Sequence, residues 1–424
     1  MNFVSRILEQ EGIYYFFKHE KGKHTLVLAD SPSSHEKVKG YEEIPYYPPQ
    51  HKERRERDHI DAWFATRQIR PGTFTARDFN FTAPKPMHVS LEHPNEHAHA
   101  HYEVYDYPGE FVVSAEGETQ THVRLEELQV EHDTVRGKGN VRAFTVGALF
   151  KLENYPRDDQ NKEYLLTELT YSIRVSGYES GKQSGEPPDY AVSFSAIDAR
   201  RQFRPPRLTR KPRVEGPQTA RVVGKKGEEA AEISTDNYGR VHILFHWDRL
   251  NQNAGEPSCT VRVAQLWAGT GFGGIHIPRI DQEVIVEFLE GDPDRPIITG
   301  RVYNQDNMPP YTLPDNKTQS GIKSRSATKG TDNNFNEIRF EDKKGSEELH
   351  IQAEKDMTTL VKHDQSTTVQ NNRSAGVTAS DSVSVGGIVR SASRASAPSR
   401  SRNPTPRLTR TRAQSTSRGR TRSP

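Results

Sequence analysis

The chain has almost no cysteine: Cys259 is the only one among 424 residues. A single thiol excludes an intramolecular disulfide framework and any zinc site made of cysteines alone. We expect Cys259 to be a small buried apolar residue. Long apolar runs are also absent, since none approaches the roughly 20 residues that cross a bilayer as a helix. The first residues lack the apolar stretch of a secretory signal, so we expect a soluble chain whose export, if any, uses no cleaved signal.

Apolar residues are scarce as well, at 32% against 27% charged residues. This balance disfavours one large compact core and favours an elongated or oligomeric protein. The net charge of +2 conceals two regions, because residues 390–424 hold ten Arg, no Lys and no acidic residue. The first 389 residues therefore hold 49 of the 59 basic side chains against all 57 acidic ones, a net charge of −8. We expect the folded part to be mildly acidic.

Most of the chain has the pattern of short β-strands. Phe3, Ile7 and Leu8 lie on one face of a predicted helix, and residues 13–17 read as a strand after Gly12. An amphipathic helix so close to the first residue leads us to expect that upstream sequence is missing. Residues 24–200 then alternate short β patterns with Pro/Gly turns, so residues 1–201 form a mainly β unit. Residues 202–216 are rich in Pro and Arg, which is typical of an extended, solvated connector.

Residues 217–305 contain about five short strands separated by tight turns, a pattern that indicates a small barrel of the OB type. Residues 306–389 are rich in Asn, Thr, Ser, Asp and Lys, with alternating strands near 336–340 and 348–351. Within them, apolar residues recur every eight positions, with Thr, Ala or Val two positions before each: Val361, Val369, Val377 and Val385. This repeat predicts a β-helix whose coils need neighbouring coils or chains to bury their apolar pair.

Residues 390–424 are disordered by composition, being rich in Arg, Ser, Pro and Thr. The repeat stops abruptly after Gly387, and a single restored nucleotide there would continue it as Asp-Arg-Thr-Val. We therefore hypothesise that the tail is a frameshift product with no selected partner.

Three groups of residues could indicate a metal or cofactor site, and each also has a simpler structural explanation. His93, His97, His99 and His101 suggest zinc, but an exposed polar strand explains alternating His equally well and no separate carboxylate supports them. The G-x-G-x-x-G run at 269–274 precedes an extended, Pro-limited stretch, so we expect a loop between strands and no dinucleotide site. Residues 290–294 read as a polar turn. We expect no metal site, no cofactor and no catalytic residues, and therefore no enzyme.

OB folds often bind single-stranded nucleic acid through stacking aromatics. Phe245, Trp247 and Trp267 could stack on bases, but Phe245 and Trp247 share one face of a predicted strand, so a place in the core explains them at least as well. The barrel segment also carries many acidic residues, which oppose a phosphate track. We expect no specific nucleic-acid partner, and this function remains a distant alternative.

Residues 236–249 resemble a signature of VgrG proteins of type VI secretion and of related phage tail spikes, and the likeness continues in order and spacing to residue 304. Weaker likeness to the hub domain of that family lies at residues 11–17, 26–30 and 104–109. Two departures are local: Thr260 replaces a usual aromatic, and Asp281 replaces a usual Gly in a turn that Asp tolerates. The residues that carry the resemblance are Asp236, Gly239, Arg240, Phe245, Trp247, Asp248, Arg249, Trp267, Gly269, Pro278, Gly291, Asp292, Pro293 and Gly300.

The resemblance implies a mainly β, three-part protein: a partial phage-hub-like domain lacking its N-terminal barrel, an OB-like barrel, and the start of a trimeric β-helix needle. It further implies a homotrimer on an Hcp tube, with a PAAR-type tip protein and effectors, that punctures a target membrane mechanically. Such a protein assembles in the bacterial cytoplasm and is then secreted. A phage or phage-like tail spike is the alternative.

Overall fold

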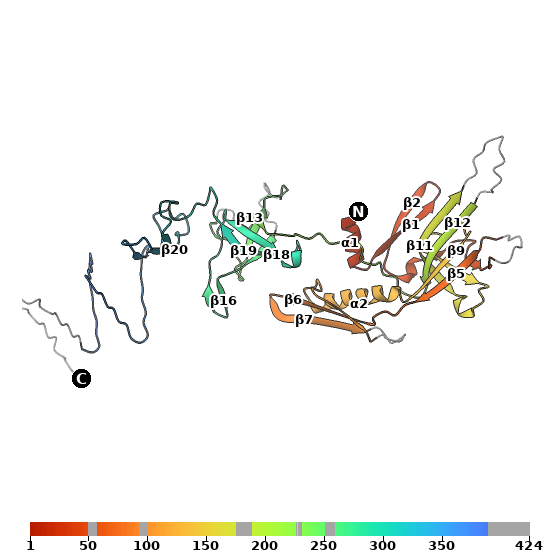
Figure 1. Ribbon diagram of the computed structural model, residues 1–424, viewed down its shortest axis with the longest axis horizontal. Coiled ribbons are helices and arrows are strands. Elements are labelled where there is room, and N and C mark those ends of the chain that lie inside the picture. The colour runs from red at the N-terminus through yellow and green to blue at the C-terminus, as the bar shows by residue number, and fades with distance from the viewer. Residues whose placement is uncertain are drawn as a thin grey trace, which may run out of the picture.

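The structure, a computed structural model, describes residues 1–49, 57–92, 101–174, 189–225, 227, 231–250 and 259–388. The molecule is elongated, and its parts follow one another in chain order from a broad N-terminal half through a small barrel to a short C-terminal sheet (Figure 1). Strands dominate, as the sequence predicts. No helix in the described ranges is both long and apolar enough to cross a membrane. His93, His97, His99 and the tail 390–424 lie outside the described residues.

A seven-stranded sheet forms the larger part of the N-terminal half. Its core is aromatic: the ring of Trp63 lies 4.9 Å from that of Tyr164 and 6.0 Å from that of Phe194, measured between centroids. The strand Ala148–Glu153 alternates buried and partly exposed residues, which is the period-two pattern expected of a strand with one face in the core. In spatial order the strands of the sheet are β3 (Glu36–Lys37), β10 (Ala148–Glu153), β11 (Glu163–Arg174), β12 (Asp189–Asp198), β9 (Asp133–Gly139) and β5 (Ile60–Arg67), with β4 (Glu43–Pro45) also paired to β10.

A helix and a hairpin precede this sheet: α1 (Asn2–Gln10), β1 (Tyr14–Glu20) and β2 (Lys23–Ala29). The inner face of the hairpin is buried through Tyr14 and Phe16. Short 3-10 turns follow at Pro32–Ser34 and at Asp158–Gln160. Beside Tyr14, the imidazole of His35 is buried between the Tyr14 hydroxyl, 2.7 Å away, and the carbonyl of Gly147, 2.9 Å away.

His35 makes the stability of this half depend on pH. Burial lowers the pKa of His35 below its ordinary value of 6.5. Between the folded and unfolded values the unfolded chain binds more protons, so the free energy of unfolding falls as pH drops below about 6.5. We expect the urea midpoint to decrease from pH 7.5 to pH 5.5, and His35→Gln to flatten that dependence. A variant with an unchanged slope would show that His35 is not its source.

The second sheet carries a helix that the sequence analysis missed. Strands β7 (Ala83–Glu92), β6 (Thr73–Asn80) and β8 (Glu103–Asp106) form the sheet, and α2 (Ser114–Val130) packs on it through Leu125. Residues 24–200 are mainly β as expected, but α2 adds a helix that the pattern of short strands did not predict. The buried positions of α2 include Thr121, Arg124 and Gln129, so its buried face is not an apolar stripe with helical period.

Residues 202–216 form no regular secondary structure and none of them is buried, but several contact the hub. Phe203 packs edge-on against Tyr14 at 4.9 Å. The guanidinium of Arg204 donates to the Gly12 carbonyl at 3.1 Å and to the Glu126 carboxylate at 2.7 Å. The connector is thus attached to α2 and to Gly12, two residues after the end of α1.

The five predicted barrel strands close into a barrel. Its core residues, among them Ala220, Val241 and Val284, are completely buried. Cys259 packs at the edge of this core and is only partly buried, against expectation. Around the barrel run β13 (Gln218–Val223), β14 (Val241–Phe245), β15 (Cys259–Val263), β19 (Pro296–Val302) and β18 (Glu283–Phe288), with a 3-10 turn at Leu289–Gly291.

The C-terminal sheet has three antiparallel strands, β20 (Gln319–Lys323), β21 (Glu337–Glu341) and β22 (Glu348–Gln352). Residues 353–388 have no regular secondary structure in the single chain. The four repeat valines all lie exposed there: Val361, Val369, Val377 and Val385.

Candidate functional site: the hub–barrel junction and an apolar sheet face

The residues that open the signature form a tight turn before β14. The Asp236 carboxylate accepts hydrogen bonds from the amides of Tyr238, at 3.0 Å, and Arg240, at 2.9 Å. It also pairs with the Arg240 guanidinium at 2.6 Å. Burial alone would raise the pKa of Asp236, but the hydrogen bonds from Arg240 and Tyr238 outweigh it and lower the pKa. Gly239 has φ 72°, a left-handed value that favours glycine.

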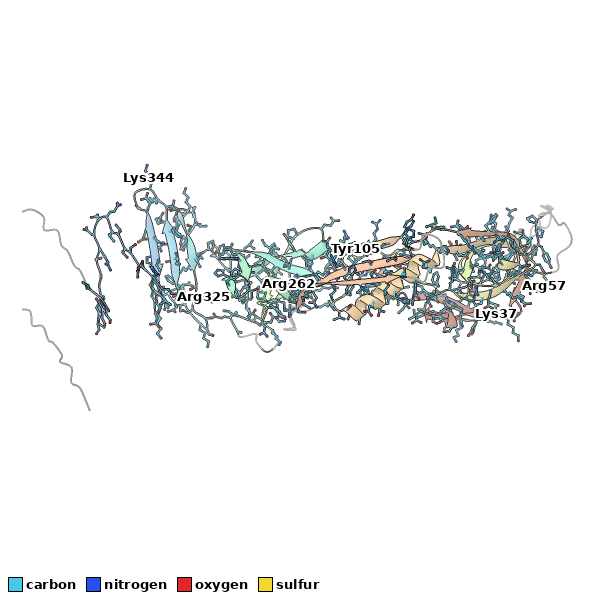
Figure 2. All side chains as sticks on the ribbon, turned by 90° about the horizontal axis from the view of Figure 1, so that it is seen from below. Lys37, Arg57, Tyr105, Arg262, Arg325 and Lys344 are labelled. Carbon is cyan, nitrogen blue, oxygen red and sulfur yellow. The ribbon has the colours of Figure 1, made fainter. Side chains whose placement is uncertain are left out.

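This turn contacts the tip of the β6–β7 hairpin. The ring of Phe81 lies between two guanidinium groups, 5.1 Å from that of Arg240 and 5.0 Å from that of Arg262. Tyr238 packs edge-on against Phe81 at 5.3 Å. Figure 2 shows Arg262 where the barrel meets the N-terminal half. The signature turn therefore helps to fix the barrel to that half.

A buried ion pair completes the junction. Arg295 donates to both carboxylate oxygens of Asp78, at 3.1 and 2.7 Å, and the Asp78 side chain is 1% exposed. Burial alone would raise the pKa of Asp78, but the bonds from Arg295 and from the amide of Phe79 hold it below its ordinary value. Alongside, Lys211 of the connector bridges Glu110, at 3.2 Å, and Asp292, at 2.8 Å. These charges join three segments that are far apart in the sequence.

The loop at residues 290–294 is a polar turn, as predicted. Gly291 has φ 72°, and a Cβ there would lie 3.2 Å from the carbonyl oxygen of Val214. The Asp292 carboxylate also accepts from the amide of Asp294 at 2.9 Å, and Pro293 is partly buried between them. Asp281 has φ 69°, which confirms that Asp occupies left-handed geometry in that turn.

The aromatic residues of the signature separate into core and surface. Phe245 is buried in the barrel and stacks on Trp247 at 5.1 Å. Trp247 itself is 67% exposed, so a place in the core does not explain it. Strand β14 ends at Phe245, and Trp247 lies in the following turn, where its indole donates to Gln218 at 2.9 Å.

The remaining signature residues have individual environments. Asp248 is buried and accepts from the amide of Leu250 at 3.1 Å, whereas Arg249 is exposed. Pro278 is buried, and a Cβ on Gly300 would contact Ile285 at 3.2 Å. The G-x-G-x-x-G run forms the hairpin of β16 (Trp267–Gly269) and β17 (Phe272–Gly274), as expected for a loop between strands. A Cβ on Gly269 would collide with the ring of Phe272.

The C-terminal sheet carries an uncovered apolar face. Ile322 pairs with Ile338, Ile338 with Ile351, and Phe340 with Leu349, so all five side chains project from one side. Each is 46–62% exposed. The opposite side is polar and better covered: Glu337 is 4% exposed and pairs with Arg339 at 3.4 Å. A sheet normally buries its apolar face against another layer, which the described part of this chain does not supply.

The histidines that the structure describes form no complete metal site. Within the described ranges no group of three or more His, Cys, Asp or Glu could hold a metal ion. His101 is exposed. His19 and His24 are cross-strand neighbours with Nδ1 atoms 2.7 Å apart, yet two imidazoles are fewer than the three or four protein ligands of a typical zinc site.

Sequence reasoning missed the Asp78–Arg295 pair and the apolar sheet face. The partners of the pair are 217 positions apart, and no local pattern links them. The sheet face did leave a signal, because Ile338 and Phe340, and likewise Leu349 and Ile351, alternate with polar residues.

Comparison with known proteins matches three family models in chain order. Residues 1–177 match the phage tail baseplate hub (GPD), residues 230–303 the type VI secretion system/phage-baseplate injector OB domain, and residues 320–395 the bacteriophage T4 gp5 C-terminal trimerisation domain. Among solved structures, the E. coli c3393 protein of the type VI secretion system is similar with TM-score 0.41 and 18% identity, over 71% of this chain and 60% of that one.

Curated relatives are closer in sequence. The type VI secretion system spike protein VgrG1a of Pseudomonas aeruginosa is 50% identical over 369 residues, 87% of this chain and 57% of that protein. The actin cross-linking toxin VgrG1 of Vibrio cholerae is 34% identical over 88% of this chain and 33% of its own length. The chain thus spans about half the length of its P. aeruginosa relatives. This chain belongs to the VgrG family of type VI secretion spike proteins.

Proposed function

We propose that the chain is a structural spike component of a type VI secretion system, a homotrimer that acts mechanically. The observation that carries the proposal is the uncovered apolar face of β20–β22, which lies within the segment matching a trimerisation domain. We propose the division 1–201 for the hub-like domain, 202–216 for the connector, 217–305 for the barrel, 306–389 for the neck and repeat, and 390–424 for the tail.

Two further copies of the chain would cover the apolar face. Three sheets that meet around a common axis bury Ile322, Ile338 and Ile351 of each chain against one another. Each of these side chains is about half exposed in the single chain, so burying the remainder contributes roughly 1 kcal/mol per side chain. The polar side of each sheet, with Glu337 and Arg339, then faces outward. Trimerisation in this way supplies the core that one chain lacks.

The eight-residue repeat extends the same arrangement. Val361, Val369, Val377 and Val385 are all exposed in the single chain. A coil with one apolar pair cannot bury that pair alone, but three coils wound together can. We propose that residues 353–388 gain regular β structure only in the trimer, as the start of a needle.

The hub–barrel junction suits a part that transmits force. Asp78–Arg295, Lys211–Asp292 and the Phe81 stack connect the hub and the barrel by contacts other than the covalent chain. A push delivered to the hub would reach the barrel through these contacts. We propose that the hub sits on an Hcp tube, that a PAAR-type tip protein and effectors ride at the other end, and that the needle punctures a target membrane.

We also propose that the chain is not an enzyme. The V. cholerae relative is named an actin cross-linking toxin, but this chain matches only 33% of its length. The signature residues lie in turns, in the barrel core, at the junction and on a hairpin, where they shape the structure. No specific nucleic acid is expected as a partner.

Export that depends on a contractile sheath tests this proposal. The chain would be produced in the cytoplasm of a type VI-active bacterium that lacks its own spike, and sought in the culture medium. We expect it outside the cell only when the sheath gene is intact. Equal release from the sheath mutant would contradict the proposal and favour the phage-tail alternative, and lysis would be monitored with a cytoplasmic marker.

A further inference from the structure

The β16–β17 hairpin is an apolar projection that its own barrel does not use. Leu266, Trp267, Phe272 and Ile275 are all more than half exposed, and Leu266 is 95% exposed. The barrel core closes without them. No Asp, Glu, Lys or Arg occurs from Val263 to Pro278, in a chain of which these four residue types make up 27%, and His276 is the one titratable side chain in that range.

Local geometry holds the hairpin in a defined shape. Trp267 pairs with Gly274 and Phe272 with Gly269, so the two rings share one face of the ribbon. Each ring stands opposite a glycine, and their centroids are 5.4 Å apart at 75°. Gly273 has φ 144°, and a Cβ there would collide with the Trp267 carbonyl. The aromatic face is therefore preformed.

The chain after the hairpin is joined to the C-terminal sheet. Arg279 donates to the carbonyl of Arg325, two residues beyond β20, at 2.6 Å and pairs with Glu232 at 3.5 Å. Glu232 in turn accepts from the amide of Lys329 at 2.6 Å. Copies joined through their C-terminal sheets would therefore bring their barrels, and these hairpins, close to one another.

We infer that the β16–β17 hairpin packs against the barrel of a second copy of this chain. This inference rests on the proposed trimer and adds a contact outside the C-terminal sheet. Interfaces between copies are depleted in charge and enriched in aromatic residues, as this hairpin is. On this inference, Trp267 and Gly269 of the signature act between chains. Asp236 and Arg240, by contrast, form contacts within one chain.

Photo-crosslinking at position 267 tests the inference in the full chain. Trp267 would be replaced by p-benzoyl-phenylalanine, and two copies with different mass tags would be mixed before assembly. Trp247 is the matched control, being 67% exposed against 65% for Trp267. We expect chain-to-chain products at least tenfold more abundant from position 267 than from position 247, and a similar yield from the positive control at Ile338.

The outcomes distinguish the hairpin contact between copies from the trimer itself. A trimer that crosslinks through position 338 and not through 267, or equally through 267 and 247, would overturn the hairpin contact and leave the trimer intact. A monomer would overturn both. Products joining 267 only to other cellular proteins would also overturn the contact between copies.

A substitution measures the strength of the contact. In Trp267→Ser/Phe272→Ser, we expect the concentration at which the trimer dissociates to rise at least tenfold, with Trp247→Ser unchanged. An unchanged dissociation concentration in the double variant would contradict the inference.

Discussion

Ile338→Asp is expected to convert the trimer into monomers. Ile338 is at the centre of the apolar face, paired with Ile322 on one side and Ile351 on the other. Ile338 is 46% exposed in the single chain, so the change removes about 1 kcal/mol of apolar burial per chain, or about 3 kcal/mol per trimer. An Asp carboxylate without a partner in a dry interface adds a further desolvation cost. The trimer association constant should fall by at least roughly 10⁴.

Ile69→Asp is the matched control for this change. Ile69 is 62% exposed, against 46% for Ile338, and lies in the hub away from the C-terminal sheet. Sedimentation velocity over a concentration series would measure both variants. If Ile338→Asp remained a trimer at the same concentrations as the parent chain, the apolar face would not be the subunit contact.

Arg295→Met is expected to destabilise the hub–barrel junction by about 3–5 kcal/mol. The change leaves the carboxylate of Asp78, 1% exposed, without its bidentate partner. The two backbone amides of Phe79 and Phe111 still donate to it, but they supply no compensating charge. We expect a lower urea midpoint and faster proteolytic cleavage in the connector at residues 202–216.

The double variant Asp78→Asn/Arg295→Met distinguishes the loss of the Asp78–Arg295 ion pair from the cost of leaving a buried carboxylate without a positive partner. The single oxygen of an uncharged Asn can accept from only one of the two backbone amides, since Phe79 and Phe111 donate to different carboxylate oxygens. We therefore expect the double variant to regain part, and not all, of the lost stability. A double variant no more stable than Arg295→Met would show that packing of the guanidinium, and not the stranded carboxylate, dominates.

The barrel and the long hub strands could be predicted because their side chains alternate with period two. Strand β14 shows the limit of this reasoning: Phe245 is in the core, but the strand ends there and Trp247 is on the surface. Helix α2 was not predicted, because polar residues such as Arg124 and Gln129 lie on its buried face and interrupt the apolar pattern of a helix. In each case contacts with distant segments outweigh the local pattern.

The hub–barrel junction and the apolar sheet face also combine features that a local pattern predicts with features that depend on distant contacts. The turn from Asp236 to Arg240 is local, so its shape follows from a few adjacent residues, including Gly239. The Asp78–Arg295 pair depends on how the hub and barrel dock, which no local pattern encodes. The apolar face of β21 was visible as alternation of Ile338 and Phe340 with charged residues, but its exposure required the fold.

The molar mass of the purified full chain, measured by light scattering during size-exclusion chromatography, tests the central claim most directly. The account predicts a mass near three times 48.1 kDa. A single species near 48.1 kDa at all accessible concentrations would contradict the trimeric spike, because the apolar face of β20–β22 would then remain open to water.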